Sequence, residues 1–443
     1  MSTYPHKLSR KEFLKLSGLG LTASFLPLGL SFGGSLRQGR LIPPGAKLRV
    51  ACVGCGGRGE FDIRWIADEE IVALCDVDPR HAEATYAKYP DVPKYTDYRA
   101  MLEEMDDQID AVTVSTPDHT HFAVAMAAIQ MGKHVLVQKP LTTTVWEARQ
   151  LQEAARQHNV VTNMGNQGHT KEGCRLAKEW FDAGLLGDVT EVHVWTNKLQ
   201  DGRYRSAIRG EMYPAQEVPS HLDWNQWIGP RPKRPYSDEV HPYRWRGWWP
   251  FGNGALGDIG CHTMDAAFFA LNLRDPIAIT AETSGYNKFT FPDWSIITYE
   301  FPARGNLPPC KMVWYDGGKV PPTPKGIEKL HEKRGYYMVG SKAGIYDPSE
   351  KCTKPRIYPE EKRRALRYSM PPETIPRCKG DNPAEEFALA CKGGPTPGSN
   401  FNYAAPLSEV VLLGNLAIRA GGQRIEWDAK RMEVSNLPEL NVH

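Results

Sequence analysis

The chain is short of several features that would mark it as a specialised class of protein. Its 443 residues carry a net charge of only +2 at pH 7, which excludes the basic excess on which nucleic-acid and anionic-membrane binding depend. Its nine cysteines are odd in number and lack repeated C-x-x-C spacing, so the sequence predicts no metal site. There are no internal repeats and no low-complexity tracts, which excludes solenoid and fibrous architectures. What remains is an ordinary soluble composition, and a chain of this length is expected to form two domains.

The N-terminal segment has the layout of an export signal. A basic stretch at 9–15, S-R-K-E-F-L-K, precedes the uncharged and glycine-rich segment 16–34. Such a pattern is typical of a secretion signal rather than of a spanning helix, and we expect no membrane span in the mature chain. The segment resembles a twin-arginine signal in which Lys11 replaces the second arginine. Residues 1–35 are therefore expected to direct the folded protein to the periplasm, the alternative being an amphipathic tail on a cytoplasmic protein.

A glycine-rich turn follows the first strand pattern. Positions 48–59 read L-R-V-A-C-V-G-C-G-G-R-G, which contains G-x-G-x-x-G. Gly54 permits a tight turn, Gly56 lets the backbone approach a pyrophosphate, and Gly59 allows close helix–strand packing. The helix that begins at Arg58 would then present unpaired backbone N–H groups to the phosphates.

An acidic residue completes this pattern. A second strand pattern at 70–75 is followed by Asp76, which is placed to hydrogen-bond a ribose 2′-hydroxyl and to repel a 2′-phosphate. We therefore predict a dinucleotide site that takes NAD rather than NADP. The alternative is a purely structural glycine turn.

Strand and helix patterns alternate over residues 46–164. The expected strands are 48–53, 71–75, 109–114, 134–137 and 160–164, and the expected helices are 58–68, one opening at Asp78-Pro79, 120–131 and 145–158. This alternation predicts an α/β Rossmann domain with a doubly wound parallel sheet, whose ligands bind at the carboxyl ends of the strands. Over residues 165–443 a long strand at 189–196 and helices at 170–183 and 406–420 predict an α+β domain with a largely antiparallel open sheet.

Three segments carry candidate catalytic chemistry. Lys139, at the end of a parallel strand, could exchange a proton with a substrate hydroxyl, or could be a solvated surface lysine. Asp258 and His262 are four residues apart on an expected helix, so the carboxylate could orient the imidazole. Their structural alternatives are a helix cap and a core histidine. Asn166 and His169 follow the last parallel strand and could bind substrate or cap the next helix.

Aromatic and basic residues concentrate between positions 195 and 250. Trp245, Trp248 and Trp249 could line a carbohydrate site, although an aromatic core explains such residues equally well. Four arginines in this region could contact an acidic sugar or could simply be solvated: Arg203, Arg205, Arg244 and Arg246.

These motifs, in this order, resemble the glucose–fructose oxidoreductase/inositol dehydrogenase (Gfo/Idh/MocA) family. The matching elements are G-x-G-x-x-G at 54–59, L-C-D-V-D at 74–78, S-T-P at 115–117 with His121, G-K-H-V leading to Lys139-Pro140, and D-I-G-C-H at 258–262. The resemblance implies a Rossmann domain, a second α/β domain that makes homo-oligomer contacts, and a catalytic group of Lys139, Asp258 and His262. It also implies the cofactor-binding residues Gly54, Gly56, Gly57, Arg58, Gly59, Asp76, Ser115, Thr116, Pro117, His121, Gln138 and Lys139. The family's usual glutamate before the lysine is Gln138 here, and a neutral amide cannot hold the lysine protonated as a carboxylate would.

Three functions are compatible with this pattern. The first is an NAD-dependent oxidoreductase that removes a hydride from a ring carbon of a sugar, glycoside or cyclitol while His262 or Lys139 accepts the hydroxyl proton. The second is a redox glycosidase, which retains NAD, oxidises the ring transiently, eliminates the aglycone and reduces the ring again. The third is a non-enzymatic sugar-binding protein that has kept only the scaffold.

Overall fold

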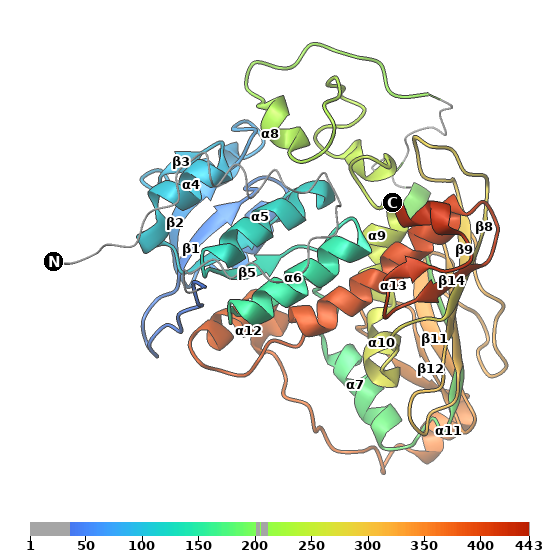
Figure 1. The fold of residues 1–443 in the computed structure, drawn as a ribbon. Helices are drawn as coiled ribbons and strands as arrows, with labels where there is room; N and C mark the ends of the chain where they lie inside the picture. The colour runs from blue at the N-terminus through green and yellow to red at the C-terminus, as the bar shows by residue number, and fades with distance from the viewer. Residues whose placement is uncertain (1–35, 201–203, 205–210, 443) are drawn as a thin grey trace.

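The computed structural model describes residues 36–200, 204 and 211–442 (Figure 1). The export signal expected at 1–35, together with Arg203 and Arg205, lies outside these residues. Within the described residues the chain forms two sheets, which Figure 1 shows side by side with helices between them.

The first sheet is the expected parallel one. It has six strands in the order β3-β2-β1-β4-β5-β6, and every pairing is parallel. The strands are β1 (Arg49–Val53), β2 (Glu70–Cys75), β3 (Lys94–Tyr95), β4 (Ala111–Val114), β5 (His134–Val137) and β6 (Thr162–Met164). The central strands β4 and β5 are buried along their whole length, because helices cover both faces of the sheet and such strands need apolar side chains on both sides.

Helices connect these strands. They are α2 (Arg58–Trp65), α3 (Glu83–Lys88), α4 (Tyr98–Glu104), η2 (Asp106–Gln108), α5 (Asp118–Gln130) and α6 (Val145–Gln157). The helix expected to open at Asp78-Pro79 begins later, at Glu83. The Asp78 carboxylate accepts hydrogen bonds from the backbone N–H groups of Arg80 and His81, at 3.1 and 3.2 Å, so it caps a turn at 79–82 that precedes the helix.

The second sheet is largely antiparallel, as expected. Its nine strands run in the order β13-β12-β11-β7-β10-β9-β8-β14-β15, and only β7 and β10 pair in parallel. The strands are β7 (Val189–Thr196), β8 (Ala278–Thr283), β9 (Ser295–Phe301), β10 (Cys310–Tyr315), β11 (Arg334–Gly340), β12 (Gly344–Asp347), β13 (Arg356–Tyr358), β14 (Ile425–Asp428) and β15 (Glu433–Val434). Burial alternates along β9, as it does when only one face of a sheet packs on the main core.

The remaining helices follow β6 in the chain. They are α7 (Glu172–Asp182), η3 (Lys198–Gln200), α8 (Trp224–Ile228), η4 (Arg244–Gly247), α9 (Gly254–Thr263), α10 (Asp265–Leu271), α11 (Glu360–Ala365), η5 (Lys379–Asp381), α12 (Pro383–Cys391), α13 (Phe401–Arg419) and η6 (Pro438–Val442). Figure 1 shows α9, α10 and α13 between the two sheets. The helix α12 returns to the Rossmann side, where Phe387 and Cys391 join a core cluster with Val50 and Leu74. The C-terminal half of the chain thus completes the Rossmann core.

The helix α13 packs against α6, α9 and β8 and joins the two halves of the molecule. Among the described residues it is the one helix long and apolar enough to cross a membrane, yet 83% of its most apolar window is buried inside the protein. Its hydrophobicity is therefore explained by its position as a core helix.

Candidate active site

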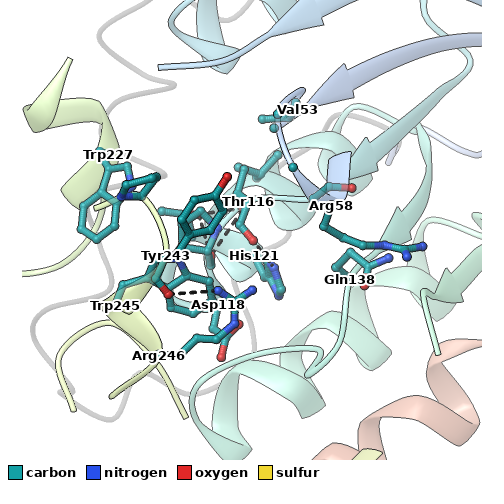
Figure 2. Close-up of a pocket in the computed structure, with 18 of the residues that line it drawn as sticks. Val53, Arg58, Thr116, Asp118, His121, Gln138, Trp227, Tyr243, Trp245 and Arg246 are labelled. Carbon is teal, nitrogen blue, oxygen red and sulfur yellow. Dashed lines mark hydrogen bonds between the residues drawn. The ribbon is translucent and has the colours of Figure 1, made fainter. Parts of the chain in front are cut away.

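A cavity of about 380 Å³ lies at the carboxyl ends of the parallel strands. Its lining comes from the glycine-rich turn, from the ends of β4 and β5, and from α9 and the loops at 226–246. Figure 2 shows Arg58 and Gln138 on one side, with Trp227, Tyr243 and Trp245 facing them from those loops. The position is the one at which doubly wound sheets bind ligands.

The glycine-rich turn has the conformation that its sequence predicts. Gly54 and Gly57 have φ of 82° and 53°, in the region that favours glycine. A Cβ on Gly59 would lie 1.9 Å from the carbonyl oxygen of Gly54, so a side chain there would separate α2 from β1. No side chain caps the start of α2, which leaves its first N–H groups available to an anionic ligand.

Asp76 lies at the end of β2 and lines the same cavity. Its carboxylate accepts backbone hydrogen bonds from Cys55 at 2.7 Å and from Gly56 at 3.3 Å, so it also fixes the glycine-rich turn. Burial raises the pKa of Asp76, and the hydrogen bonds from the backbone of Asp78 and Cys55 oppose that rise. Together with the uncapped helix and the crowded glycines, this carboxylate fits the phosphates and ribose of a dinucleotide.

Lys139 and Asp258 form an ion pair in the cavity. The Lys139 ammonium group contacts the Asp258 carboxylate and donates to the Asp258 carbonyl oxygen at 2.8 Å. Tyr204 also donates to this carboxylate, and the Arg246 Nε lies 3.6 Å from it. Burial alone would raise the pKa of Asp258, but Lys139 and Arg246 outweigh burial and hold that pKa well below its usual range. The carboxylate that faces Lys139 is therefore supplied by Asp258, and this compensates for the neutral Gln138.

His262 is oriented by an amide and not by Asp258. Its Nδ1 lies 2.7 Å from the Asn166 Oδ1, and the Asn166 Nδ2 donates to the Cys261 carbonyl at 2.8 Å. Because that carbonyl accepts from the amide nitrogen, the amide oxygen faces His262 and its Nδ1 must carry the proton. Burial, followed by the charges of Lys139 and Lys351, lowers the pKa of His262 well below its usual range. The imidazole is therefore neutral, and its Nε2, which no hydrogen bond of the described residues occupies, can accept a proton.

Two predicted substrate-binding residues serve a different purpose. Asn166 is fully buried, does not line the cavity and acts through His262. His169 lies outside the cavity, where its Nδ1 is 3.1 Å from the Asp265 carboxylate. The turn at Gly168 directs its side chain toward α10, away from the strand ends. The expectation that Asp258 orients His262 is also corrected, since the described residues show no hydrogen bond between the two and Asp258 binds Lys139.

The three tryptophans predicted to line a carbohydrate site, Trp245, Trp248 and Trp249, lie in three different surroundings. Trp245 lines the cavity, where Figure 2 shows its ring beside Arg246. Trp248 is fully buried in an aromatic cluster with Tyr213 and Phe251, and its indole donates to the Glu239 carbonyl at 3.1 Å. Trp249 lines a second, separate cavity. Only Trp245 is therefore in position to contact a ring held near Lys139, because adjacent residues of this segment point in different directions.

The remaining predicted cofactor-binding residues all line the cavity, and several also hold its walls together. Ser115 and Gln138 both donate to the buried Asp62 carboxylate, at 2.7 and 2.9 Å, and Arg58 pairs with the same group at 2.5 Å. The two ring nitrogens of His121 lie 2.9 Å from the carbonyl oxygens of Thr116 and Pro140. His121 thereby ties the 115–117 turn to the segment that carries Lys139. Thr116 and Pro117 complete that turn at the start of α5.

The cavity also contains charged residues beyond the predicted catalytic group. Lys351, from the loop after β12, lines the cavity, and burial followed by the charge of Lys139 lowers its pKa to about 8. Asp118, at the start of α5, also lines it, and burial raises its pKa to about 7. Of the two arginines expected near an acidic sugar that the structure describes, Arg244 and Arg246, Arg246 approaches Asp258. Lys351 is remote in sequence from the other site residues and carries no motif, so only an alignment could have suggested it.

One buried cluster offers donor atoms of the kind that bind metals. Single ligand atoms of His169, Cys174 and Asp265 lie within 4.8 Å of one another. The Asp265 carboxylate already accepts a hydrogen bond from Tyr403 at 2.5 Å as well as facing His169. These contacts explain the cluster as a hydrogen-bonded core network.

Comparison with known proteins places the chain in a family. Residues 48–166 match the NAD-binding Rossmann fold of the Gfo/Idh/MocA oxidoreductase family, and residues 173–318 match the C-terminal alpha/beta domain of that family. A glycosyl hydrolase family 109 protein of Shewanella pealeana is 32% identical over 244 residues, which cover 47% of this chain and 53% of that protein. An inositol 2-dehydrogenase of Burkholderia multivorans is 31% identical over 188 residues, which cover 41% of this chain and 54% of that protein. The matched segments thus span about half the length of these relatives.

A solved structure extends the likeness over most of the chain. The WlbA dehydrogenase from Bordetella pertussis, in complex with NADH and UDP-GlcNAcA, superposes with a TM-score of 0.60 at 16% identity. The match covers 86% of this chain and 99% of that one, and it supports the fold. With two family domains in the expected order and the family's motifs gathered in one cavity, the chain belongs to the Gfo/Idh/MocA oxidoreductase family and carries its NAD-binding Rossmann domain.

Proposed function

We propose that this protein is an NAD-dependent oxidoreductase acting on a ring hydroxyl of a sugar, glycoside or cyclitol. One observation carries the proposal: Lys139, paired with Asp258, and the free Nε2 face of a neutral His262 line the same cavity as the glycine-rich turn. A proton acceptor beside a dinucleotide site is what oxidation of a secondary alcohol requires.

The chain's own residues would divide the work as follows. NAD, when bound at the glycine-rich turn and Asp76, supplies the hydride acceptor. His262 Nε2 takes the hydroxyl proton as the ring carbon becomes a carbonyl, because Asn166 fixes the proton of the imidazole on the other nitrogen. Lys139 lies at the end of β5 and is placed to hold the developing oxyanion, with Asp258 fixing its position. Trp245 and Tyr243 would cover the ring from the loop side (Figure 2).

The preference for NAD over NADP rests on Asp76. Its buried carboxylate at the end of β2 would repel a 2′-phosphate and accept a hydrogen bond from a 2′-hydroxyl. We expect NAD to bind at least tenfold more tightly than NADP. Titration of both cofactors against the quenching of tryptophan fluorescence would measure this, and equal affinities would contradict the role given to Asp76.

The activity is tested by following NADH absorbance as purified protein meets a panel of cyclitols, free sugars and glycosides. Reduction of NAD that depends on one class of ring, with a ketone as product, is the expected result. Protein that neither contains nor binds a dinucleotide would refute the proposal and favour a non-enzymatic sugar-binding role.

A redox glycosidase is the second candidate, because a glycosyl hydrolase family 109 protein is 32% identical to this chain over 244 residues. In that case the same proton acceptor would serve oxidation, elimination and re-reduction on one retained cofactor. Stoichiometric NAD released on denaturation, with an aglycone produced and no net NADH, would identify it. Exchangeable NAD that is reduced in step with product would exclude it.

We further propose that the chain is exported through its twin-arginine-like segment and assembles as a homo-oligomer through the open sheet. Both proposals follow from the family resemblance and from residues 9–34. Fractionation of cells producing the full chain, with Arg10→Gln as the comparison, tests export. Sedimentation of the purified protein tests assembly, and a monomer at micromolar concentration would refute it.

A further inference from the structure

A second cavity, of about 340 Å³, lies between the start of α6, the end of α13 and the loops at 231–234 and 249–253. Figure 1 shows α6 and α13 running close together in this region. Four cationic side chains line the cavity: Arg231, Arg234, Lys288 and Arg419. Among the described residues that line it there is no aspartate and no glutamate. The cavity is thus a concentration of positive charge within the folded chain.

Within the part of the chain that the structure describes, no carboxylate pairs with the arginines of this cavity, whereas other arginines of this protein have such partners. Arg49 pairs with Asp110 and Arg149 with Glu409, both at 2.7 Å. Arg231 instead donates to the neutral hydroxyl of Thr143, and Arg419 stacks on the Trp249 ring at 4.4 Å.

Buried polar atoms without a hydrogen-bond partner among the described residues occur on three of the residues that line this cavity. They are the buried Nε atoms of Arg231 and Arg234 and the Oδ1 of Asn415. The Glu147 carboxylate, in the first turn of α6, accepts hydrogen bonds from Thr143 and Thr144. Burial and the neighbouring charge of Arg231 lower the pKa of Arg419, which is what a shortage of counter-charge produces. Charges placed in this way destabilise a fold unless a ligand neutralises them.

We propose that this second cavity is a binding site for a sugar-sized phosphate or sulfate ester. Several guanidinium groups together suit a divalent oxyanion, which accepts their planar forks of donors. The volume exceeds that of a bare oxyanion, and Trp249, Leu412 and Leu416 provide apolar wall for an organic body.

The second cavity is distinct from the active-site cavity, but the two lie close together. Asn253 lines the second cavity, and its amide donates at 2.9 Å to Asp118, which lines the first. The proposal does not rest on the dehydrogenase activity, because none of its four cations contacts Lys139, Asp258 or His262 in the described residues. Binding of NAD can therefore serve as an independent measure of correct folding.

The test compares the full-length protein with Arg419→Met, Arg231→Met and Arg234→Met, and with Arg367→Met as a control that removes an exposed arginine outside the cavity. The thermal midpoint is measured against inorganic sulfate, inorganic phosphate and glucose 6-phosphate, each matched in ionic strength with sodium chloride. We expect the thermal midpoint to rise saturably in the wild type and in Arg367→Met. Glucose 6-phosphate should give half of its maximal rise at a concentration at least tenfold lower than sulfate does. Each cavity variant should lose most of that rise while still binding NAD.

Several results would overturn the proposal. The first is the absence of a saturable rise of the thermal midpoint in the wild type, and the second is an equal rise in all variants. The third is tighter binding of glucuronate, added in the same assay as a carboxylate sugar, than of sulfate or phosphate. Dissociation of an oligomer by sulfate, seen in sedimentation, would show instead that the cavity holds an acidic side chain of a second copy. If one cavity variant fails to fold, as shown by loss of NAD binding, the other two decide the outcome.

Discussion

The two cavities of this protein treat their charges in opposite ways. In the first, the Asp258 carboxylate meets the ammonium group of Lys139, and the imidazole of His262 has its Nδ1 fixed by Asn166. In the second, the guanidinium group of Arg231 donates to the Thr143 hydroxyl and that of Arg419 stacks on the Trp249 ring, and no carboxylate of the described residues pairs with either. Both cavities have similar volumes, about 380 and 340 Å³, so size does not separate their functions.

The difference shows which kind of site each cavity is built to be. Groups that transfer protons need fixed geometry and controlled pKa values before the substrate arrives, and internal partners supply both. Groups that only bind an anion leave their hydrogen-bond donors available to the ligand. The folded state is less stable without the ligand and gains stability when the ligand binds. The pairing of charges is therefore a better guide to function here than the kinds of residues present.

The largest effect is expected from Lys139→Met. This change removes the cation at the end of β5, and loss of such a group lowers kcat by about 10²- to 10⁴-fold. NAD binding should persist, because the glycine-rich turn and Asp76 are untouched. Lys133→Met is the matched control: Lys133 precedes the same strand at its other end and pairs with Asp106 at 3.0 Å. That variant should lose stability and keep kcat, and an equal loss of kcat in both would contradict the role of Lys139.

Asn166→Asp tests whether His262 is the proton acceptor. A carboxylate against Nδ1 favours the charged imidazole and raises its pKa by roughly 1 to 3 units. Because the base must be neutral, activity is lost below that pKa, so the acidic limb of the kcat/KM profile should move to higher pH. Asn166→Ala is the control, since it removes the hydrogen bond without adding charge and should lower activity without that displacement. Coincident pH profiles for wild type and Asn166→Asp would exclude His262 as the acceptor.

Much of the fold follows from local pattern. The strands β5 and β7 begin and end at the predicted residues, 134–137 and 189–196, because each is a run of apolar or alternating side chains bounded by polar residues or turns. The α3 helix begins at Glu83, later than expected, because a tighter turn with an i→i+3 bond from Glu83 to Arg80 lies between Asp78 and the helix. The packing of α12 on the Rossmann core joins residues hundreds of positions apart, and no local pattern reports it.

The site was predictable in its members and not in its pairings. Lys139, Asp258 and His262 share a cavity because strand ends and α9 meet there. That Asp258 pairs with a lysine 119 residues away, and not with the histidine one turn along its helix, depends on tertiary packing. The same limit applies to Trp248 and Trp249, since composition shows that a segment is aromatic but not which ring faces a ligand.

Asp118→Asn tests the first cavity at a buried carboxyl group that forms no ion pair in the described residues. Burial raises the pKa of Asp118 to about 7, above the unfolded value of about 4, so the folded state holds this proton more tightly. The stability from Asp118 is fully present below the unfolded pKa and is lost as the pH rises through 7. Asparagine removes this dependence, and the variant should gain about 1–3 kcal/mol over the wild type between pH 4 and pH 8. Urea unfolding across that range measures the gain.

The matched control for that experiment is Asp188→Asn, which alters an exposed carboxylate. Its free energy of unfolding should follow the wild type at every pH. If Asp118→Asn also follows the wild type, Asp118 is solvated or paired in solution, and the first cavity is more open than the structure shows.

The smallest effect is expected where a charge is removed from the second cavity. Arg149→Met, outside that cavity, serves as the comparison. It leaves Glu409 buried with the Trp427 indole at 3.0 Å as its remaining partner among the described residues, and breaking such a pair costs about 3 kcal/mol. Arg419→Met leaves no carboxylate behind. It loses stacking on Trp249 but relieves repulsion from Arg231, so the free energy of unfolding should change by less than about 1 kcal/mol. Urea unfolding in sodium chloride, without phosphate or sulfate, compares the two variants. Equal losses would mean that Arg419 has a structural counter-charge in solution, and the contrast between the two cavities would then fail.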